Sequence, residues 1–190
     1  MQTILSTSDI LLVPTVEKEI PYIWDLLDQW PSGCVWKSMY KDYEDFEEDI
    51  KLRLKDHQRD ATWTCWTKSG KASKKFGIAM LTKIAFGLSA DIHGIADKEF
   101  YKNLQNKRLR RTYADKAADL VLKHCFETLG VARVNATFYK KDPLVMALLK
   151  RHGFKRHAVL QKSVYINEQI HPTYIYGLLE DDYLGETKNV

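Results

Sequence analysis

Apolar and polar residues follow two repeating patterns along the chain, and each pattern predicts one type of secondary structure. Alternation with a period of two, or a short apolar run bounded by turn residues, predicts a β-strand. Apolar positions three and four residues apart predict the buried face of an α-helix. On this basis we expect strands over 10–13, 61–67, 76–86, 88–96, 131–139, 158–166 and 170–179. Helices are expected over 20–30, 42–56, 113–129 and 143–152.

Residues with unusual backbone preferences mark several boundaries of these elements. Gly130 should end its helix in the left-handed conformation that glycine tolerates. Asp142 is expected to cap the last helix, with Pro143 at the first helical position and Gly153 just after the end. Because Pro172 cannot donate a ladder hydrogen bond, its strand should lie at an edge or contain a bulge.

The order of the elements predicts the fold class, which is α/β. We expect a mixed, mostly antiparallel central sheet of about seven strands flanked by helices, with 61–67 and 76–86 as antiparallel neighbours. No repeat, low-complexity block or long linker interrupts the pattern, and 190 residues with 45% apolar content suffice for one core. We therefore expect a single domain over 1–190, with a flexible tail after about residue 183.

Composition indicates where the protein is expected in the cell and which state its cysteines should have. No apolar run approaches the ~20 residues of a membrane helix, and the N-terminus does not resemble a signal peptide, so we expect a cytoplasmic protein without membrane contact. Cys34, Cys65 and Cys125 are odd in number and widely spaced. This argues against a disulfide framework or a zinc site and favours reduced core thiols.

Positive charge is concentrated in one segment, although the net charge of the whole chain is only +4. The segment from Lys102 to Arg111 contains five basic residues and no acidic residue, and it precedes the helix predicted to begin at Tyr113. Free N–H groups and the helix dipole attract anions at such a position, so a phosphate-binding site is expected there. The alternatives are a solvated loop or a nucleic-acid contact, and the latter should weaken steeply with salt.

Five segments contain short sequence motifs that occur in a fixed order. They are Ala-Asp-Ile-His-Gly-Ile-Ala-Asp (90–97), Tyr-Ala-Asp-Lys-Ala (113–117), Phe-Glu-Thr-Leu-Gly-Val-Ala-Arg-Val (126–134), Leu-Leu-Lys-Arg-His-Gly-Phe-Lys-Arg (148–156), and the last hairpin with Tyr-Ile-Asn (165–167) and Tyr-Gly-Leu-Leu (176–179). Together, over about half of the chain, they resemble the GCN5-related N-acetyltransferase (GNAT) family. The branch they resemble most acetylates ribosomal-protein N-termini and similar amines.

The resemblance implies acetyl-CoA as the cofactor and a primary amine as the acceptor. It implies Asp91 as the general base, and His93, two residues along the same strand face, is a second candidate. A splayed strand would also offer backbone N–H groups to the thioester oxygen. The cofactor-binding residues implied are Ile95, Ala96, Leu109, Arg110, Arg111, Thr112, Tyr113 and Ala114.

The chain departs from the family pattern at several positions. In the pyrophosphate loop, Thr112 replaces a glycine that lets the backbone approach phosphate, and Leu109 replaces a polar residue. Val145 stands where the branch usually has serine. Leu149 stands where much of the family has a tyrosine that acts as the general acid. About six extra residues lengthen the loop around 102–107.

The threonine allows two interpretations of this loop. Thr112 lies three residues before Asp115, so its hydroxyl could cap the helix and occupy an N–H that a phosphate would need. Alternatively, Arg110 and Arg111 bind the phosphate directly through their guanidinium groups. The sequence alone leaves both open.

We therefore predict an N-acetyltransferase that moves acetyl from acetyl-CoA to a protein N-terminus, a lysine or a small amine. The principal alternative is a protein that keeps the fold but has lost catalysis and acts as a binding or structural module in an assembly. Nucleic-acid binding through 102–111 is the least favoured alternative. A homo-oligomer or a protein assembly is compatible with either of the first two.

Overall fold

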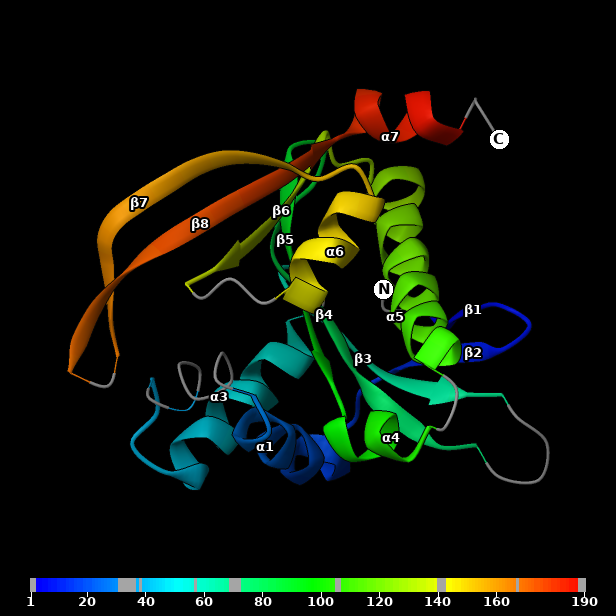
Figure 1. Ribbon diagram of the computed structural model, residues 1–190. Coiled ribbons are helices and arrows are strands. Elements are labelled where there is room, and N and C mark those ends of the chain that lie inside the picture. The colour runs from blue at the N-terminus through cyan, green and yellow to red at the C-terminus, as the bar shows by residue number, and fades with distance from the viewer. Residues whose placement is uncertain are drawn as a thin grey trace. The chain divides into compact units, whose positions relative to one another are not determined.

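A computed structural model describes residues 3–30, 37, 39–56, 58–68, 73–104, 107–139, 143–166 and 168–187, with the backbone alone for 107–111, 186 and 187. The strands are β1 (Leu5–Ser6), β2 (Ile10–Pro14), β3 (Ala61–Thr67), β4 (Lys75–Ala85), β5 (Ser89–Ala96), β6 (Arg133–Phe138), β7 (Lys155–Ile166) and β8 (Gln169–Leu179). The helices are η1 (Glu17–Glu19), α1 (Ile20–Asp28), α3 (Tyr43–Lys55), α4 (Lys98–Asn103), α5 (Lys107–Lys123), the π-helical turn η2 (His124–Thr128), α6 (Pro143–Arg151) and α7 (Glu180–Thr187). Figure 1 labels most of them.

The strands pair in the order β1-β2-β3-β4-β5-β6-β8-β7. β5 and β6 are parallel, whereas β2–β3, β3–β4, β6–β8 and β7–β8 are antiparallel. The predicted fold class, an α/β fold with a mixed and mostly antiparallel sheet, is therefore confirmed. The sheet has eight strands rather than seven, because β1 is two residues long and too short to show a period.

The chain divides into two compact units. The first unit comprises Met1–Thr82 and His93–Val121, and the second comprises Lys83–Ile92 and Leu122–Val190. β4 and β5 each contribute residues to both units. The expected single domain over 1–190 stays a prediction.

The core of the first unit lies where α1 and α3 pack on β4. Its apolar residues recur at helical spacing on both helices, as the sequence pattern predicted. Asp42 caps α3 by accepting a hydrogen bond from the Asp45 amide at 3.0 Å. The buried members of the core are Ile20, Ile23, Leu26, Leu27, Phe46, Ile50, Leu54, Ile78 and Met80.

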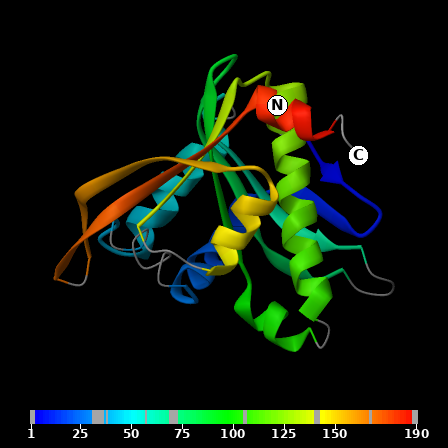
Figure 2. The ribbon, with the colours of Figure 1, turned by 45° about the horizontal axis from the view of Figure 1, so that its top comes forward.

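A second cluster in the same unit joins β4, α4 and α5 through aromatic rings. The Tyr113 ring stacks on Phe76 with centroids 5.6 Å apart, and Phe100 of α4 lies 5.9 Å from Phe76. Figure 2 shows α4 beside the beginning of α5. These contacts attach the segment that carries the basic residues to the sheet.

The second unit is built on β6, β8 and β7. β8 pairs with β6 from Leu179 to Tyr174, and beyond that point β7 is its partner among the described residues. Pro172 lies in this second part, next to a register shift in β7, so the predicted edge or bulge position is confirmed. Gly130 and Gly153 follow their helices with φ of 61° and 75°, which confirms both predicted ends. The predicted cap Asp142 lies outside the described residues.

Candidate active site

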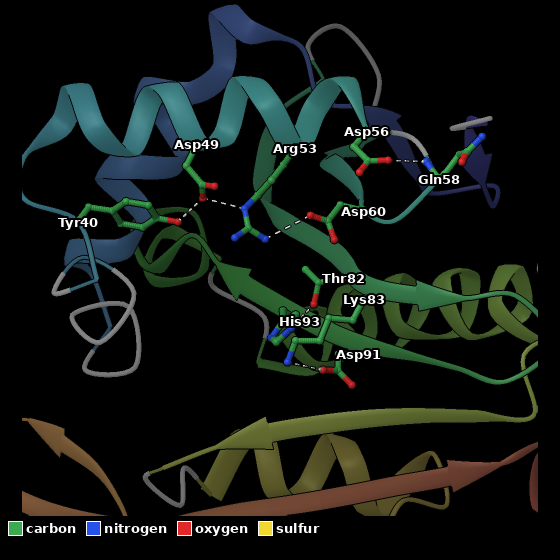
Figure 3. Close-up of polar contacts among 10 residues, drawn as sticks. All are labelled: Tyr40, Asp49, Arg53, Asp56, Gln58, Asp60, Thr82, Lys83, Asp91 and His93. Carbon is green, nitrogen blue, oxygen red and sulfur yellow. Dashed lines mark hydrogen bonds and ion pairs between the residues drawn. The ribbon is translucent and has the colours of Figure 1, made fainter.

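Three adjacent strands contribute side chains around the carboxylate of Asp91, the predicted base. Asn135 of β6 donates from Nδ2 to Asp91 Oδ1 at 3.0 Å. Lys83 of β4 places Nζ 3.4 Å from Asp91 Oδ2, as Figure 3 shows. The Asp91 side chain is 18% exposed, whereas that of Lys83 is 83% exposed. The carboxylate is therefore held at both oxygens and still reaches solvent.

Backbone geometry explains this convergence. The parallel register of β5 and β6 sets Asp91 opposite Asn135, and paired residues on neighbouring strands point to the same face. Lys83 has φ of 52°, a left-handed conformation that lysine rarely adopts. Because a regular strand sends successive side chains to opposite faces, this irregular residue interrupts the alternation of β4. It lets Lys83 reach the side chain of Asp91.

His93, the second predicted catalytic residue, is held by a different partner. Its Nε2 lies 3.0 Å from Thr82 Oγ1, and either atom can donate, depending on the tautomer of the ring. Asp91 and His93 are two residues apart on β5, as the sequence indicated. Among the contacts drawn in Figure 3, those of these two residues are separate: His93 is paired with Thr82, and Asp91 is paired with Lys83.

The predicted cofactor-binding residues Ile95 and Ala96 end the same strand. The Ile95 side chain packs against the core of the first unit, and the Ala96 carbonyl accepts a 2.6 Å hydrogen bond from Trp30 Nε1. The pairs between β5 and β6 end at Asp91 with Asn135, so among the described residues 92–96 have no β6 partner. This part of β5 therefore has an edge whose amides are not used by β6.

Alternation of the backbone indicates which amides point to that edge. The Asp97 amide donates to the Phe76 carbonyl on β4, so residues an odd number of positions from Asp97 direct their amides the other way. Within 93–96, the part of β5 that belongs to the first unit, these are Gly94 and Ala96. Sequence reasoning named Ala96 but missed the exposed Gly94, whose backbone role leaves no side-chain signal.

The predicted phosphate-binding segment has a different local structure from the one expected. α5 begins at Lys107 and not near Tyr113, so 109–112 are helical and not part of a loop. Thr112 is the sixth residue of the helix, so the interpretation in which its hydroxyl caps the helix, one of the two left open, is wrong. Amides without an intrahelical partner belong to the first four residues, 107–110. The amides of Thr112, Tyr113 and Ala114 lie inside the helix.

The remaining loop residues are placed as follows. Leu109, Arg110 and Arg111 lie in the first two turns of α5, and their side chains are outside the description. Thr112 and Ala114 are half-buried. The Tyr113 ring belongs to the aromatic cluster with Phe76 and Phe100. The early start follows from sequence, since lysine, arginine and leucine are good helix formers.

A pocket of 380 Å³ in the first unit lies beside this helix, lined among others by Lys74, Lys75, Asp97, Asn103 and Tyr113. Lys75 Nζ lies 2.9 Å from Oε1 of the buried Glu19 and over the rings of Tyr22 and Trp66. Burial, and then the charge of Asp97, raises the pKa of Tyr22, whose hydroxyl donates to that carboxylate at 3.3 Å. Sequence reasoning missed this group because its members come from three distant segments.

Other predicted features of the chemistry can be compared with the structure. Cys65 and Cys125 are free and buried, which confirms reduced core thiols for these two, whereas Cys34 lies outside the described residues. Within the described part of the chain, no three His, Cys, Asp or Glu residues form a group able to hold a metal ion. No helix of the described residues is long and apolar enough to cross a membrane.

The architecture has clear counterparts among solved structures. No protein-family model and no curated protein sequence match the chain. Its structure is similar to a spermidine N-acetyltransferase from Vibrio cholerae in complex with CoA and spermine (TM-score 0.74, 19% identity, 94% of this chain and 99% of that one). It is also similar to the ribosomal L7/L12 alpha-N-protein acetyltransferase in complex with coenzyme A (0.73, 14%, 95% and 99%).

A third similar structure is a probable acetyltransferase of the GNAT family from Chromobacterium violaceum, with a TM-score of 0.70 and 16% identity over 96% of this chain and 89% of that one. At such low identities the likeness concerns the fold and not the residues that act. All three neighbours are acetyltransferases that match more than nine tenths of this chain with TM-scores of 0.70 or above. The chain has the GNAT acyl-CoA N-acyltransferase fold.

Proposed function

We propose that this protein is an N-acetyltransferase that moves the acetyl group of acetyl-CoA to a primary amine. The observation that carries the proposal is the carboxylate of Asp91, held by Asn135 and Lys83 on the strand where the sequence resemblance implies a base. Two neighbours of the same fold are complexes with CoA, and one is a spermidine N-acetyltransferase, whereas the other is an alpha-N-protein acetyltransferase. The proposed acceptor is therefore either a small amine or a protein N-terminus.

The residues of the first unit fit the cofactor in two places. The first four amides of α5 lack intrahelical partners, and Arg108, Arg110 and Arg111 add positive charge to the same turns, which suits a diphosphate. The amides of Gly94 and Ala96 point to the unpaired edge of β5, which suits a carbonyl oxygen. Bound acetyl-CoA would supply an activated acyl group as a thioester.

The remaining chemistry belongs to side chains and backbone amides of β5. An amine must lose a proton before it attacks a thioester, and Asp91 accepts that proton directly or through water. His93, beside Thr82, is the second candidate for this step. The amides of Gly94 and Ala96 stabilise the negative charge that develops on the carbonyl oxygen.

The first experiment is calorimetric titration of the protein with acetyl-CoA, where we expect a dissociation constant in the micromolar range. Transfer is then measured as release of free CoA thiol, with spermidine and a peptide carrying a free α-amine as two separate acceptors. We expect turnover with one of them. Absence of both binding and turnover would contradict the proposal.

The role of Asp91 is tested by Asp91→Asn, which removes the base and keeps the shape of the side chain. We expect kcat to fall by about 10²- to 10⁴-fold, the usual contribution of general base catalysis, with unchanged affinity for acetyl-CoA. Asp182→Asn is a matched control, because Asp182 forms an ion pair with exposed Lys155 at 2.8 Å, and this pair lies far along the chain from β5. A variant at Asp91 that keeps full activity would assign the base to another residue.

One observation favours the alternative, a protein that has kept the fold and lost catalysis. Leu149 stands at the position where the resemblance implies a tyrosine as general acid. Its side chain is buried, at 7% exposure, and has no proton to donate. Such a protein would bind partners and not acetyl-CoA. The calorimetric titration therefore separates the two functions.

A further inference from the structure

Asn135 is a polar residue in a strand position that otherwise favours apolar side chains. It is 9% exposed, and its neighbours on β6, Val134 and Ala136, are buried apolar residues. Its Nδ2 donates to Asp91 Oδ1, but no donor of the described residues reaches its Oδ1. The reverse assignment of the amide would place Oδ1 against the carboxylate, two acceptors together, so the orientation is set by Asp91.

A buried acceptor without a partner destabilises a folded protein, because the water it loses on folding is not replaced. A valine at this position would bury no polar atom and would suit a β-strand. The amide therefore does not serve stability. What it does in this structure is hold one oxygen of Asp91.

The other partner of Asp91 cannot hold the carboxylate in one orientation as well. Lys83 is 83% exposed, and an ion pair of such a flexible side chain is weak. Asn135 is buried, short and placed on a paired strand directly opposite Asp91. A base must be held close to the proton it accepts, so this fixed donor bears on catalysis.

We infer that Asn135 is a positioning residue for Asp91: its buried amide fixes the carboxylate for proton transfer, at a cost to stability. This inference rests on the proposed function. A group that acts through another loses its effect once that other group is removed. A structural residue does not behave in this way, and this difference makes the inference testable.

The experiment uses Asn135→Val, with Asn135→Ala as a second variant that cannot clash, in the wild-type and Asp91→Asn backgrounds. In the wild-type background we expect kcat to fall at least ~10-fold, with the KM for acetyl-CoA within about twofold. In the Asp91→Asn background we expect no further fall. The thermal unfolding midpoint of Asn135→Val should equal or exceed that of the wild type.

Val134→Ala is the matched control on the same strand, since it removes buried apolar volume without touching Asp91. We expect it to lower the unfolding midpoint and leave kcat within about twofold. Two results would overturn the inference. One is that Asn135→Val and Asn135→Ala retain full kcat, and the other is that their effects multiply with that of Asp91→Asn.

If the wild-type protein acetylates neither spermidine nor the peptide, the proposed function fails, and the contact is then judged by NMR alone. The side-chain amide signal of Asn135 is assigned by its loss in Asn135→Val. A shift of this signal in Asp91→Ala but not in Val134→Ala would then show the contact alone, and the role in proton transfer would fall with the proposed function. An Asn135 signal indifferent to Asp91→Ala overturns the contact as well.

Discussion

Burial controls the ionisation of several single side chains in this protein. Burial raises the pKa of the Cys65 thiol and raises that of Cys125 to about 12, so both remain protonated. The buried carboxylate of Glu19 instead has partners, Thr64 Oγ1 at 2.9 Å and Lys75 Nζ at 2.9 Å. The buried thiols lose water without cost in charge because they stay neutral. The buried Glu19 carboxylate instead receives hydrogen bonds from protein donors in place of water.

His124, which is 5% exposed, gives a pH-dependent prediction. Burial lowers its pKa below the ordinary 6.5, because the charged imidazolium loses hydration. The unfolded chain therefore binds the proton more readily. The stabilising effect of the neutral ring is complete above pH 6.5 and is lost as the pH falls through the lowered pKa.

We accordingly expect the free energy of unfolding, measured with urea, to decrease between pH 7.5 and pH 5.5 more in the wild type than in His124→Gln. The comparison between the two proteins removes the contribution of the other histidines. Parallel pH dependences in the two proteins would contradict the expectation.

β4 and β5 approach each other closely at Gly77, where no side chain separates the two backbones. A Cβ on Gly77 would lie 2.4 Å from the Ile95 carbonyl oxygen, and Gly77 has φ of 152°. The neighbouring atoms are backbone and cannot turn away. This approach places the end of β5, with Ile95 and Ala96, against β4.

Gly77→Ala should therefore destabilise the fold by more than about 2 kcal/mol, since it adds a steric clash to backbone strain. Gly87→Ala is the matched control. Gly87 also has a positive φ, 72°, but a Cβ there meets nothing within 4 Å, so only strain of about 1–2 kcal/mol is expected. Chemical denaturation measures both, and equal losses would show that the contact with Ile95 is unimportant.

The molecule as a whole combines a modest net charge with strongly localised basic residues. The chain carries +4 overall, and five basic residues lie between Lys102 and Arg111. A phosphate-rich ligand at the beginning of α5 would bind the folded chain and not the unfolded one. Such a ligand stabilises the entire protein by mass action.

Acetyl-CoA at about 100 times its dissociation constant should stabilise the protein by about 2.7 kcal/mol. For a chain of this length this corresponds to a rise of about 5–10 °C in the thermal unfolding midpoint. Scanning calorimetry measures it, with pantothenate, which lacks the diphosphate and the nucleotide, as the control ligand. An unchanged midpoint would argue for the alternative without cofactor binding.

Much of the fold could be predicted from local patterns. The strand over 61–67 has the predicted bounds, and Gly130 ends its helical segment as expected. Such features depend on residues two to four positions apart, which alternation and helical spacing report directly. The α/β class follows from their order. Asp91 was predicted as the base from a short sequence motif and not from its contacts, and its role stays a prediction.

The remaining features depend on contacts between distant segments, which no local pattern reports. The two-residue strand β1 is defined by its pairing with β2 and not by a pattern of its own. The sequence did not reveal that α5 begins at Lys107, because basic residues occur in both loops and helices. The attachment of this helix to β4 and α4 depends on contacts of the Tyr113 ring with Phe76 and Phe100, which are distant in sequence. Asn135 lies 44 residues from Asp91, and strand pairing alone brings them together. Side-chain periodicity is encoded within each element, whereas register and shared sites arise only when the elements pair.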